Sequence, residues 1–251
     1  MLTEKRHSLI LERLKQFGVV QSQELMVELD CSESTIRRDL DMLEQAKQLK
    51  RIHGGAKRLY HLDDEQTMHE KTFKNIHEKQ AIGQLAASFI NKNDVIFLDA
   101  GSSTYAMIPF LSTTDHITVV TNGIQHASTL AEQQIETYLL GGKIKQTTKA
   151  VIGAKSLQQL ADYRFDKVFL GINGIDASLG CTTPDPEEAT LKQSALGQSA
   201  ISYVLADHSK WDKVSFVKVC SIDEVCIITD KLTTSHSQKY NELTTIMEAI
   251  K

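Results

Sequence analysis

Six short apolar runs recur between residues 95 and 228, and their spacing limits how this chain can fold more than any other feature. They span residues 95–98, 117–120, 137–140, 168–170, 201–205 and 225–228. Each run has the length of a buried strand, and the segments between the runs are long enough for crossover helices. Strands that alternate with crossovers form a parallel sheet. The sequence therefore predicts an α/β fold with a largely parallel sheet.

The first 60 residues follow a different pattern, in which apolar residues recur every three or four positions, as on amphipathic helices. We expect one helix from Thr3 to Gly18, a second capped by Ser22, and a third capped by Ser32 after a tight turn. Their buried stripes are Ile10, Leu14 and Phe17; Leu25 and Leu29; and Ile36, Leu40 and Leu43. This spacing is typical of a helix-turn-helix unit.

Residues 49–58 predict a β-hairpin after the third helix. Two short basic stretches flank Gly54 and Gly55, and this glycine pair can supply the positive φ angles of a tight turn. Residues 34–60 contain seven basic and three acidic residues, a local charge of +4 in a chain whose net charge is −4. Such a patch beside a helix-turn-helix favours a nucleic-acid partner. We interpret the hairpin as the wing of a winged helix-turn-helix.

The third helix and the wing carry the candidate DNA-contacting residues. If Ile36, Leu40 and Leu43 face inward, a rotation of about 100° per residue turns the polar residues of the first turns outward. Arginine can contact guanine with two hydrogen bonds, while serine, threonine and lysine reach phosphates. The candidates are Ser34, Thr35, Arg37 and Arg38 on the helix and Lys50, Arg51, His53, Lys57 and Arg58 on the wing. The alternative is a solvated face on which Glu33 pairs with Arg37.

Residues 59–73 are polar and charged without a sustained period, which is typical of a linker whose ends are compatible with helix. The chain then divides into a DNA-binding domain at residues 1–58, a linker at residues 59–73 and a larger domain at residues 74–251. No run approaches the roughly 18 apolar residues of a membrane helix, and no apolar signal segment follows the N-terminus. Four cysteines without CxxC spacing favour reduced thiols. We expect a cytoplasmic protein with no membrane partner.

The first apolar run ends in a turn of small residues that favours an anion site. Asp99 follows the run, and Gly101, Ser102, Ser103 and Thr104 open the next helix. A strand-to-helix turn of this kind offers backbone N–H groups, hydroxyls and the positive end of a helix dipole, which together can hold a phosphate. The alternative is a serine-capped turn without a ligand.

Polar residues also follow the later runs, at the edge where an open α/β sheet binds its ligands. Further candidates for an effector site there are Thr121, Asn122, Gly142, Asn173, Gly174, Asp176, Glu188, Lys192, Asp207 and Lys210. The residues expected around a bound sugar are Asp99, Asn173, Asp176, Glu188 and Lys210. Two alternatives stay open: Lys210 could contact a phosphate instead, and Glu188 could pair with Lys192 on a helix surface.

The histidine spacing does not predict a metal site. His53, His61, His69 and His77 lie eight residues apart, but eight residues advance a helix by about 80° beyond two turns, so these side chains do not share a face. The HExxH, Walker A and GxSxG motifs are absent from the sequence. We expect no metal, no cofactor and no catalytic residue.

Two separate groups of motifs resemble the DeoR family of bacterial transcriptional repressors over essentially the whole chain. SESTIRRDL at residues 32–40 and RIHGGA at residues 51–56 are similar to the family's winged helix-turn-helix. LDAGSST at residues 98–104, TNG at residues 121–123 and GINGID at residues 171–176 are similar to its sugar-phosphate sensor domain. The resemblance implies a sensor that is like ribose-5-phosphate isomerase in fold. It is strongest to fructose-operon repressors, which implies fructose 1-phosphate as the inducer.

Three positions depart from the family pattern. Cys31 stands where Val or Ile is usual, which is a tolerable change in a core. Ser103 stands where Thr is usual and keeps the hydroxyl. Lys47 stands where Gly is common after the recognition helix, so the helix end lacks a residue suited to the left-handed conformation, and this bears on the angle of the wing.

The resemblance implies a repressor that binds double-stranded operator DNA and responds to a phosphorylated sugar, and we expect a homodimer or a larger even homo-oligomer. The alternative is an active sugar-phosphate isomerase with a DNA-binding appendage. In that case Asp99, Asp176 or Glu188 would be the general base, and Lys192 or Lys210 would stabilise an enediolate oxygen. A third hypothesis is a nucleic-acid-binding module whose larger domain is purely structural.

Overall fold

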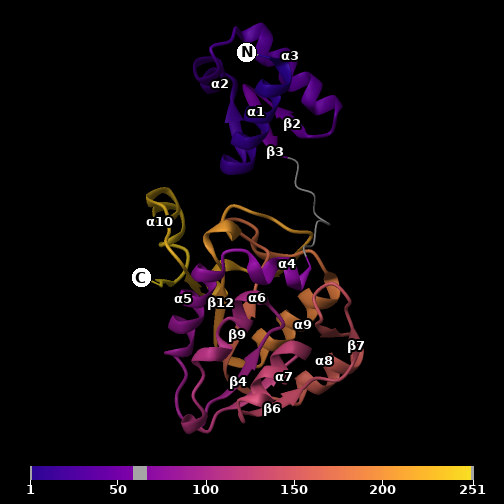
Figure 1. Cartoon of the computed structure of the whole chain (residues 1–251), viewed down its shortest axis with the longest axis vertical. Coiled ribbons are helices and arrows are strands. Elements are labelled where there is room, and N and C mark those ends of the chain that lie inside the picture. Colours follow the sequence, from indigo (N-terminus) through magenta and orange to yellow (C-terminus); the bar gives the residue numbers. More distant parts are fainter. Residues whose placement is uncertain (1, 59–66, 250–251) are drawn as a thin grey trace. The chain divides into compact units, whose positions relative to one another are not determined.

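Figure 1 shows the computed structural model of the chain, which describes residues 2–58 and 67–249. The chain forms two compact units, Met1–His61 and Leu62–Lys251. Each unit encloses a hydrophobic core of its own, as separate domains do.

The first unit is a winged helix-turn-helix, as predicted. Its three strands form an antiparallel sheet in the order β1-β3-β2, and the apolar stripes of its three helices pack together on one core. Its elements are α1 (Thr3–Phe17), β1 (Val19–Gln21), α2 (Ser22–Leu29), α3 (Glu33–Gln45), β2 (Leu49–Ile52) and β3 (Gly55–Arg58).

Two local predictions for the first unit are wrong. Ser22 is the first residue of α2 rather than its N-cap, because Gln21 at the end of β1 takes the cap position and the Ser22 N–H donates to the Gly54 carbonyl at 2.8 Å. Phe17 is 55% exposed rather than buried. It is the last residue of α1, and its ring lies 5.0 Å from the Arg13 guanidinium instead of in the core.

The end of α3 determines where the wing begins. Lys47 adopts a left-handed conformation with a φ of 54°, and the Gln48 N–H then donates to the Leu43 carbonyl at 2.9 Å. This closes the helix as a glycine would, at a backbone cost of about 1–2 kcal/mol. The lysine at this position therefore leaves the turn into the wing intact.

The second unit contains a seven-stranded sheet in the order β15-β14-β12-β9-β4-β5-β6, and every neighbouring pair in it is parallel. The predicted α/β fold is confirmed, and β15 is a short strand that the sequence did not predict. The strands are β4 (Val95–Leu98), β5 (Thr118–Thr121), β6 (Glu136–Leu139), β9 (Phe165–Gly171), β12 (Ser199–Leu205), β14 (Cys226–Thr229) and β15 (Ile246–Glu248).

Helices cover both faces of this sheet and bury two separate apolar cores. One core contains residues of α8 (Ala154–Ala161) and α9 (Pro186–Gly197), and the other contains residues of α5 (Ile76–Ala87) and α7 (Ile124–Glu132). Successive strand residues alternate between the two cores, so nearly continuous apolar strands are buried on both sides.

The other elements of the second unit are short. The helices are α4 (Met68–Phe73), α6 (Ser102–Tyr105), α10 (Thr234–Tyr240), η1 (Ile108–Phe110), η2 (Thr113–Asp115), η3 (His208–Lys210) and η4 (Ile222–Glu224). The strands form a hairpin of β7 (Lys143–Ile144) and β8 (Val151–Ile152), and an antiparallel sheet of β10 (Gly174–Asp176), β11 (Gly180–Thr183) and β13 (Val217–Cys220). Within residues 2–58 and 67–249, no helix is long and apolar enough to cross a membrane.

Two regions of the second unit differ from the sequence prediction. The run at residues 137–140 was predicted to be buried, but β6 is an outer strand, and Tyr138 and Leu139 are each 46% exposed. Residues 68–73, at the end of the predicted linker, form α4, whose Met68 is buried and donates its N–H to the Thr147 carbonyl at 2.9 Å. α4 is therefore part of the second unit. The rest of the predicted linker up to residue 66 lies outside the described residues.

Gly54 and Gly55 form a matched pair that tests the wing. A Cβ added at Gly55 would lie 2.0 Å from the Val20 carbonyl oxygen, whereas Gly54 has open space around it and a φ of +78°. We expect Gly55→Ala to break the pairing of β1 with β3, and Gly54→Ala to cost only about 1–2 kcal/mol through its left-handed backbone. Thermal unfolding followed by circular dichroism measures both. Equal destabilisation by the two substitutions would contradict this account.

Candidate functional site

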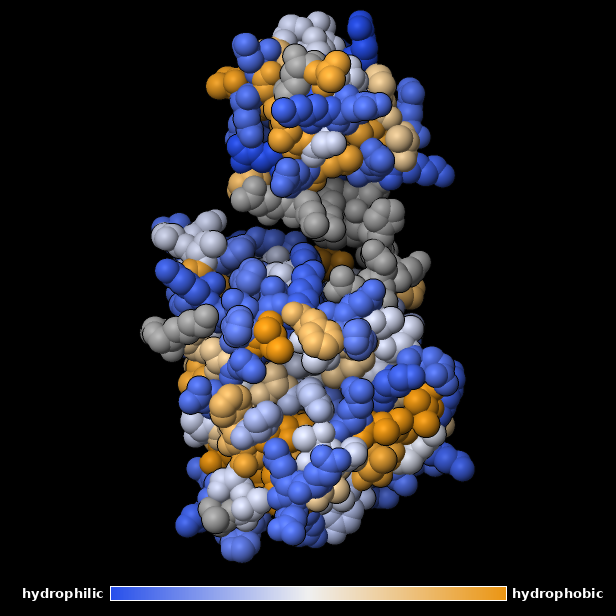
Figure 2. Space-filling model, in the orientation of Figure 1, coloured by the Kyte–Doolittle hydropathy of each residue, from blue (hydrophilic) through white to orange (hydrophobic). Residues whose placement is uncertain are grey.

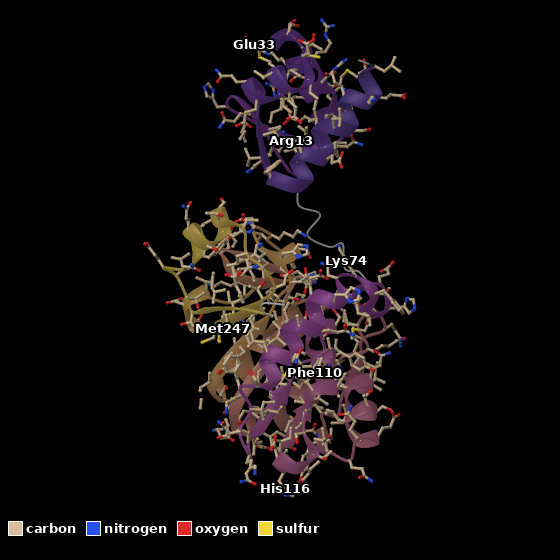
Figure 3. The ribbon with its side chains drawn as sticks, turned by 60° about the vertical axis from the view of Figure 1, so that its left-hand side comes forward. Arg13, Glu33, Lys74, Phe110, His116 and Met247 are labelled. Atoms are coloured by element: carbon tan, nitrogen blue, oxygen red, sulfur yellow. The ribbon has the colours of Figure 1, made fainter. Side chains whose placement is uncertain are left out.

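Polar side chains near the start of α3 form an outward face. Ser32 caps the helix as predicted, with its Oγ 3.3 Å from the Thr35 N–H. The side chains exposed along these turns are Ser34, Arg37 and Arg38, and Thr35 is half-buried. Glu33 lies at the N-terminal end of the helix (Figure 3), and the described residues contain no ion pair between it and Arg37. The two arginines are therefore available to a partner.

A buried ion pair fixes α3 against α1. The Arg6 guanidinium on α1 donates to both carboxylate oxygens of Asp39 on α3, at 2.5 and 2.9 Å, and His7 lies 3.1 Å from the same carboxylate. Burial raises the pKa of Asp39, but the hydrogen bonds from Arg6 and His7 outweigh it and hold this pKa below its ordinary value. The orientation of the outward face of α3 therefore depends on an ionised carboxylate beneath it.

Positive side chains of the wing lie opposite one another. Lys50 on β2 pairs in register with Lys57 on β3, and both are exposed. Like charges in this arrangement repel each other, so a polyanion beside the wing would relieve an internal repulsion. His53 is exposed at the turn, and the side chain of Arg58 lies outside the described residues.

Arg51 is held by α3. Its guanidinium pairs with Asp41, and its backbone N–H donates to Glu44 Oε1 at 2.8 Å. Both acceptors belong to α3, so these contacts attach the wing to the helix. The sequence predicts that Arg51 contacts DNA. In the structure, its contacts with Asp41 and Glu44 hold the wing against α3.

A cavity at the carboxyl ends of β4 and β9 brings together about half of the predicted effector residues. Those that line it are Asp99, Gly101, Ser102, Ser103, Asn173, Glu188, Lys192 and Lys210. The lining residues that the sequence did not predict are Met68, Lys71, Ala100, Thr148, Gly171 and Ile172. Gly171 and Ile172 belong to the GINGID motif, which could have identified them. Met68 and Lys71 had no such signal, because they lie in the segment interpreted as a linker.

Asp99 and Lys192 form a buried ion pair in the cavity wall. Their exposed fractions are 2% and 5%. Lys192 Nζ donates to Asp99 Oδ2, which also accepts the Gly171 N–H at 3.0 Å. The contacts join α9 to the ends of β4 and β9. Removal of one partner would leave an uncompensated buried charge, which typically costs about 3–5 kcal/mol.

Glu188 faces the cavity and does not pair with Lys192, so the alternative of a pair on the helix surface does not hold. Its Oε1 accepts from Thr148 Oγ1 at 2.7 Å and lies 3.3 Å from Lys145 Nζ. Asp185, which caps α9, shares the same lysine at 2.9 Å. These contacts attach α9 to the loop between β7 and β8.

The turn after β4 has fewer free donors than its sequence predicts. The Gly101 N–H donates to the Asp99 carbonyl at 2.8 Å and to Thr104 Oγ1 at 3.0 Å. The Thr104 side chain is buried, so its hydroxyl points inward. α6 is only four residues long, so its dipole is small. Ser102 and Ser103 remain open to the cavity, since neither hydroxyl has a hydrogen-bond partner among the described residues.

Lysines crowd one side of the cavity. Burial lowers the pKa of Lys210, Asp207 opposes the shift, and repulsion from Lys71 and Lys74 adds to it. Burial also lowers the pKa of Lys79, to about 8. Asp207 again opposes the shift, and repulsion from Lys71 and Lys74 again adds to it. Lys74 is on the face of the second unit that carries α4 (Figure 3). Lys79 and Lys210 therefore share Asp207 as a neighbouring carboxylate.

The remaining predicted effector residues do not line the cavity; they are Thr104, Thr121, Asn122, Gly142, Gly174, Asp176 and Asp207. Most of them stabilise the turns around it. Asn122 Oδ1 accepts the Ala100 N–H at 2.9 Å, and Thr121 Oγ1 donates to the Leu98 carbonyl at 2.6 Å. Asp176 accepts two N–H groups of its own turn. Their local hydrogen bonds explain why polar residues occur at these strand ends.

The structure brings no metal-binding cluster together in the described ranges. There, no three His, Cys, Asp or Glu side chains are arranged to hold an ion, and the four cysteines are free thiols. His53, His69 and His77 are exposed, and His61 lies outside the described residues.

Comparison with known proteins adds two family matches. Residues 6–61 match the DeoR-like helix-turn-helix domain, and residues 74–231 match the DeoR C terminal sensor domain. The HTH-type transcriptional regulator FruR of Bacillus subtilis is 46% identical, over 98% of each chain. The lactose phosphotransferase system repressor of Staphylococcus epidermidis is 33% identical, over 88% of this chain and 89% of the repressor. Ribose 5-phosphate isomerase A of Methanocaldococcus jannaschii aligns over 55% of each chain, at 15% identity and a TM-score of 0.42.

The depressed pKa of Lys79 predicts a pH dependence of stability. Because the pKa is about 8 in the folded chain and ordinarily 10.5, the unfolded chain binds the extra proton between these values, and stability rises with pH across this range. In Lys79→Met the slope of unfolding free energy against pH should be shallower, by up to about 1.4 kcal/mol per pH unit. Denaturant unfolding of both proteins across this range measures it. Parallel pH dependences would show that Lys79 does not titrate there.

Proposed function

The chain belongs to the DeoR family of transcriptional regulators, and on that premise we propose that it represses a sugar-utilisation operon under the control of a phosphorylated sugar. Fructose 1-phosphate is the first effector to test. The observation that carries the proposal is the cavity at the carboxyl edge of the sheet, where the ammonium group of Lys210 lines the same space as the open hydroxyls of Ser102 and Ser103. The lactose phosphotransferase system repressor, named for a sugar system, supports the sugar class.

We assign the contacts with operator DNA to α3 and the wing. Arg37 and Arg38 enter the major groove, where an arginine can make two hydrogen bonds to guanine. Lys50 and Lys57 contact the phosphate backbone, which offsets their mutual repulsion. The operator is an inverted repeat bound by a homodimer or a larger even homo-oligomer, because one winged helix covers a single half-site. The protein acts in the cytoplasm, where this DNA is.

In the effector site, charge and hydrogen-bonding capacity suggest an orientation for the ligand. The phosphate lies at Ser102, Ser103 and Lys210, since ammonium and hydroxyl groups are suitable donors to phosphate oxygens. The sugar hydroxyls lie toward Asn173 and Glu188, whose amide and carboxylate can bond to them. Asp176, which faces its own turn, has no part in this proposal.

The arrangement favours binding over isomerisation. Asp99 is neutralised by its ion pair, and Glu188 is engaged by Thr148 and Lys145, so neither carboxylate is poised as a general base. Asp176 does not line the cavity. A turnover assay on aldose and ketose phosphates tests this choice, and interconversion that Asp99→Asn abolishes would establish the isomerase instead.

The DNA contacts predict distinct effects for helix and wing. Arg37→Ala and Arg38→Ala should each weaken binding to the specific operator by about 1–3 kcal/mol. Their affinity for random DNA should change little. Lys57→Ala should weaken both and reduce the slope of log affinity against log salt by about 0.9. Fluorescence anisotropy at several salt concentrations measures all of them. Arg13→Ala, on α1, is the control, and wild-type affinity in both α3 variants would remove this helix from recognition.

The effector contacts predict that Lys210→Met loses affinity for fructose 1-phosphate. Loss of a charge-assisted hydrogen bond worth about 1.5–3 kcal/mol corresponds to a decrease of at least tenfold. Isothermal titration gives the affinities. Lys218→Met, at an exposed lysine of β13, is the charge-matched control, and free fructose is the control for the phosphate. If no sugar phosphate binds the wild type, or if free fructose binds equally well, the proposed effector class is wrong.

A further inference from the structure

The outer edge of β6 is open. β6 is the last strand of the seven-stranded sheet, and β5 is its only partner strand within the described parts of the chain (Figure 1). The Leu140 N–H donates to the Thr121 carbonyl of β5 at 2.9 Å, and alternate residues of a strand point their N–H and C=O groups to opposite edges. Thr137 and Leu139 therefore point these groups away from β5. Among the described residues, these backbone groups have no hydrogen-bond partner.

The open stretch of this edge is bounded on both sides by residues whose backbone groups are already used. Before it, the Ile135 N–H and carbonyl both have partners on the same chain, at 3.1 and 2.8 Å. After it, the Gly141 N–H donates to Gln159 Oε1 at 2.7 Å, and the Gly141 carbonyl accepts from Ser156 Oγ at 2.9 Å. The open stretch is therefore short and is centred on Tyr138.

The side chains of β6 lack the features that usually protect an outer strand. Outer strands of soluble proteins commonly carry a lysine, a proline or a bulge that prevents further pairing. β6 contains none of these, and its only charged residue is Glu136 at its start. Tyr138 and Leu139 are each 46% exposed, and the Tyr138 hydroxyl already donates to Glu136 Oε1 at 3.2 Å. The apolar pattern of an inner strand thus occurs at an outer position.

We propose that β6 pairs with β6 of a second copy of this chain, antiparallel across a two-fold axis at Tyr138, so that the two seven-stranded sheets become one continuous sheet. This axis places Thr137 of one copy opposite Leu139 of the other, and each such pair exchanges two N–H···O bonds. The resulting hydrogen bonds use every free group of both open stretches. An axis shifted by one residue in either direction would instead bring Ile135 or Gly141, whose groups are occupied, into the pairing.

The same symmetry suits the side chains. The two Tyr138 rings face each other in a pair that exchanges no hydrogen bonds, where opposite side chains lie closest, and aromatic cross-strand pairs stabilise sheets. Glu136 lies opposite Leu140 of the second copy, so the two Glu136 carboxylates are about 13 Å apart along the strands and do not oppose each other. A two-fold interface needs a surface that matches itself in this way. The pairing rests on the proposed function, in which a homodimer binds an inverted repeat, and assigns its interface to β6.

Charge substitutions at Tyr138 test the pairing in the full-length protein. In Tyr138→Glu or Tyr138→Lys, like charges would face each other across the axis, whereas an equimolar mixture of the two variants would place opposite charges there. Tyr138→Phe keeps the ring, and Phe216→Glu introduces a charge at an exposed aromatic residue outside β6. Sedimentation equilibrium measures the dimer dissociation constant of each protein, and hydrogen exchange measures the protection of the Thr137 and Leu139 amides. Thermal unfolding verifies that each variant is folded.

We expect the wild type to form dimers in which the Thr137 and Leu139 amides exchange about tenfold or more slowly than in the diluted monomer. Each Tyr138 charge variant should raise the dimer dissociation constant by about tenfold or more, and their mixture should restore tight association. Tyr138→Phe and Phe216→Glu should leave the constant near its wild-type value.

Three results would overturn the β6 pairing and leave the proposed function standing: charge variants that dimerise like the wild type, a mixture that associates no better than either variant alone, or wild-type amides that exchange equally fast in dimer and monomer. A wild type that stays monomeric at micromolar concentration, with and without operator DNA, would overturn both the pairing and the homodimer. A wild type that dimerises as expected but binds neither operator DNA nor a sugar phosphate would support the pairing and overturn the proposed function.

Discussion

Each unit is organised around a buried carboxylate that is held in an ion pair. In the second unit Asp99 accepts from Lys192 and from the Gly171 N–H, so one side chain joins two strand ends to a helix. In the first unit Asp39 does the same between α1 and α3. A buried charge is tolerated only with such partners, and the partners come from distant parts of the sequence. The surfaces above both carboxylates therefore keep a defined geometry.

Lysines gather at two places, each of which is assigned to phosphate in the proposed function. On the wing, Lys50 and Lys57 are exposed and opposite each other, which fits the regular charges of a DNA backbone. In the cavity, Lys71 and Lys210 surround a space with a few hydroxyls, which fits one small anion. In the proposed function, the same chemistry serves an extended ligand in one unit and an enclosed ligand in the other. Figure 2 shows hydrophilic residues interspersed with apolar ones over the visible surface of each unit, so overall polarity alone does not reveal these sites.

Sequence patterns predicted those features that depend on neighbouring residues or on topology. Apolar runs predicted the parallel sheet because burial on both faces requires them, and its shared carboxyl edge explains why residues such as Asn173 and Lys210 converge. The same runs could not distinguish the outer strand β6 from an inner one. Lys71 and Thr148 were missed because tertiary contacts of α4 and the β7–β8 loop bring them to the cavity. The donors expected at Gly101 and Thr104 satisfy each other, which spacing does not reveal.

The strand order of the second unit also determines when each strand can pair during synthesis. β5 pairs with β4 and β6 with β5; then β9 pairs with β4, β12 with β9, β14 with β12 and β15 with β14. Every strand after β4 therefore has a partner that precedes it in the chain, and the sheet can grow outward from β4 as the chain leaves the ribosome. Because synthesis is slow compared with strand pairing, no strand after β4 has to wait unpaired for one not yet made. The topology limits the exposure of apolar strand edges, and hence aggregation, during biosynthesis.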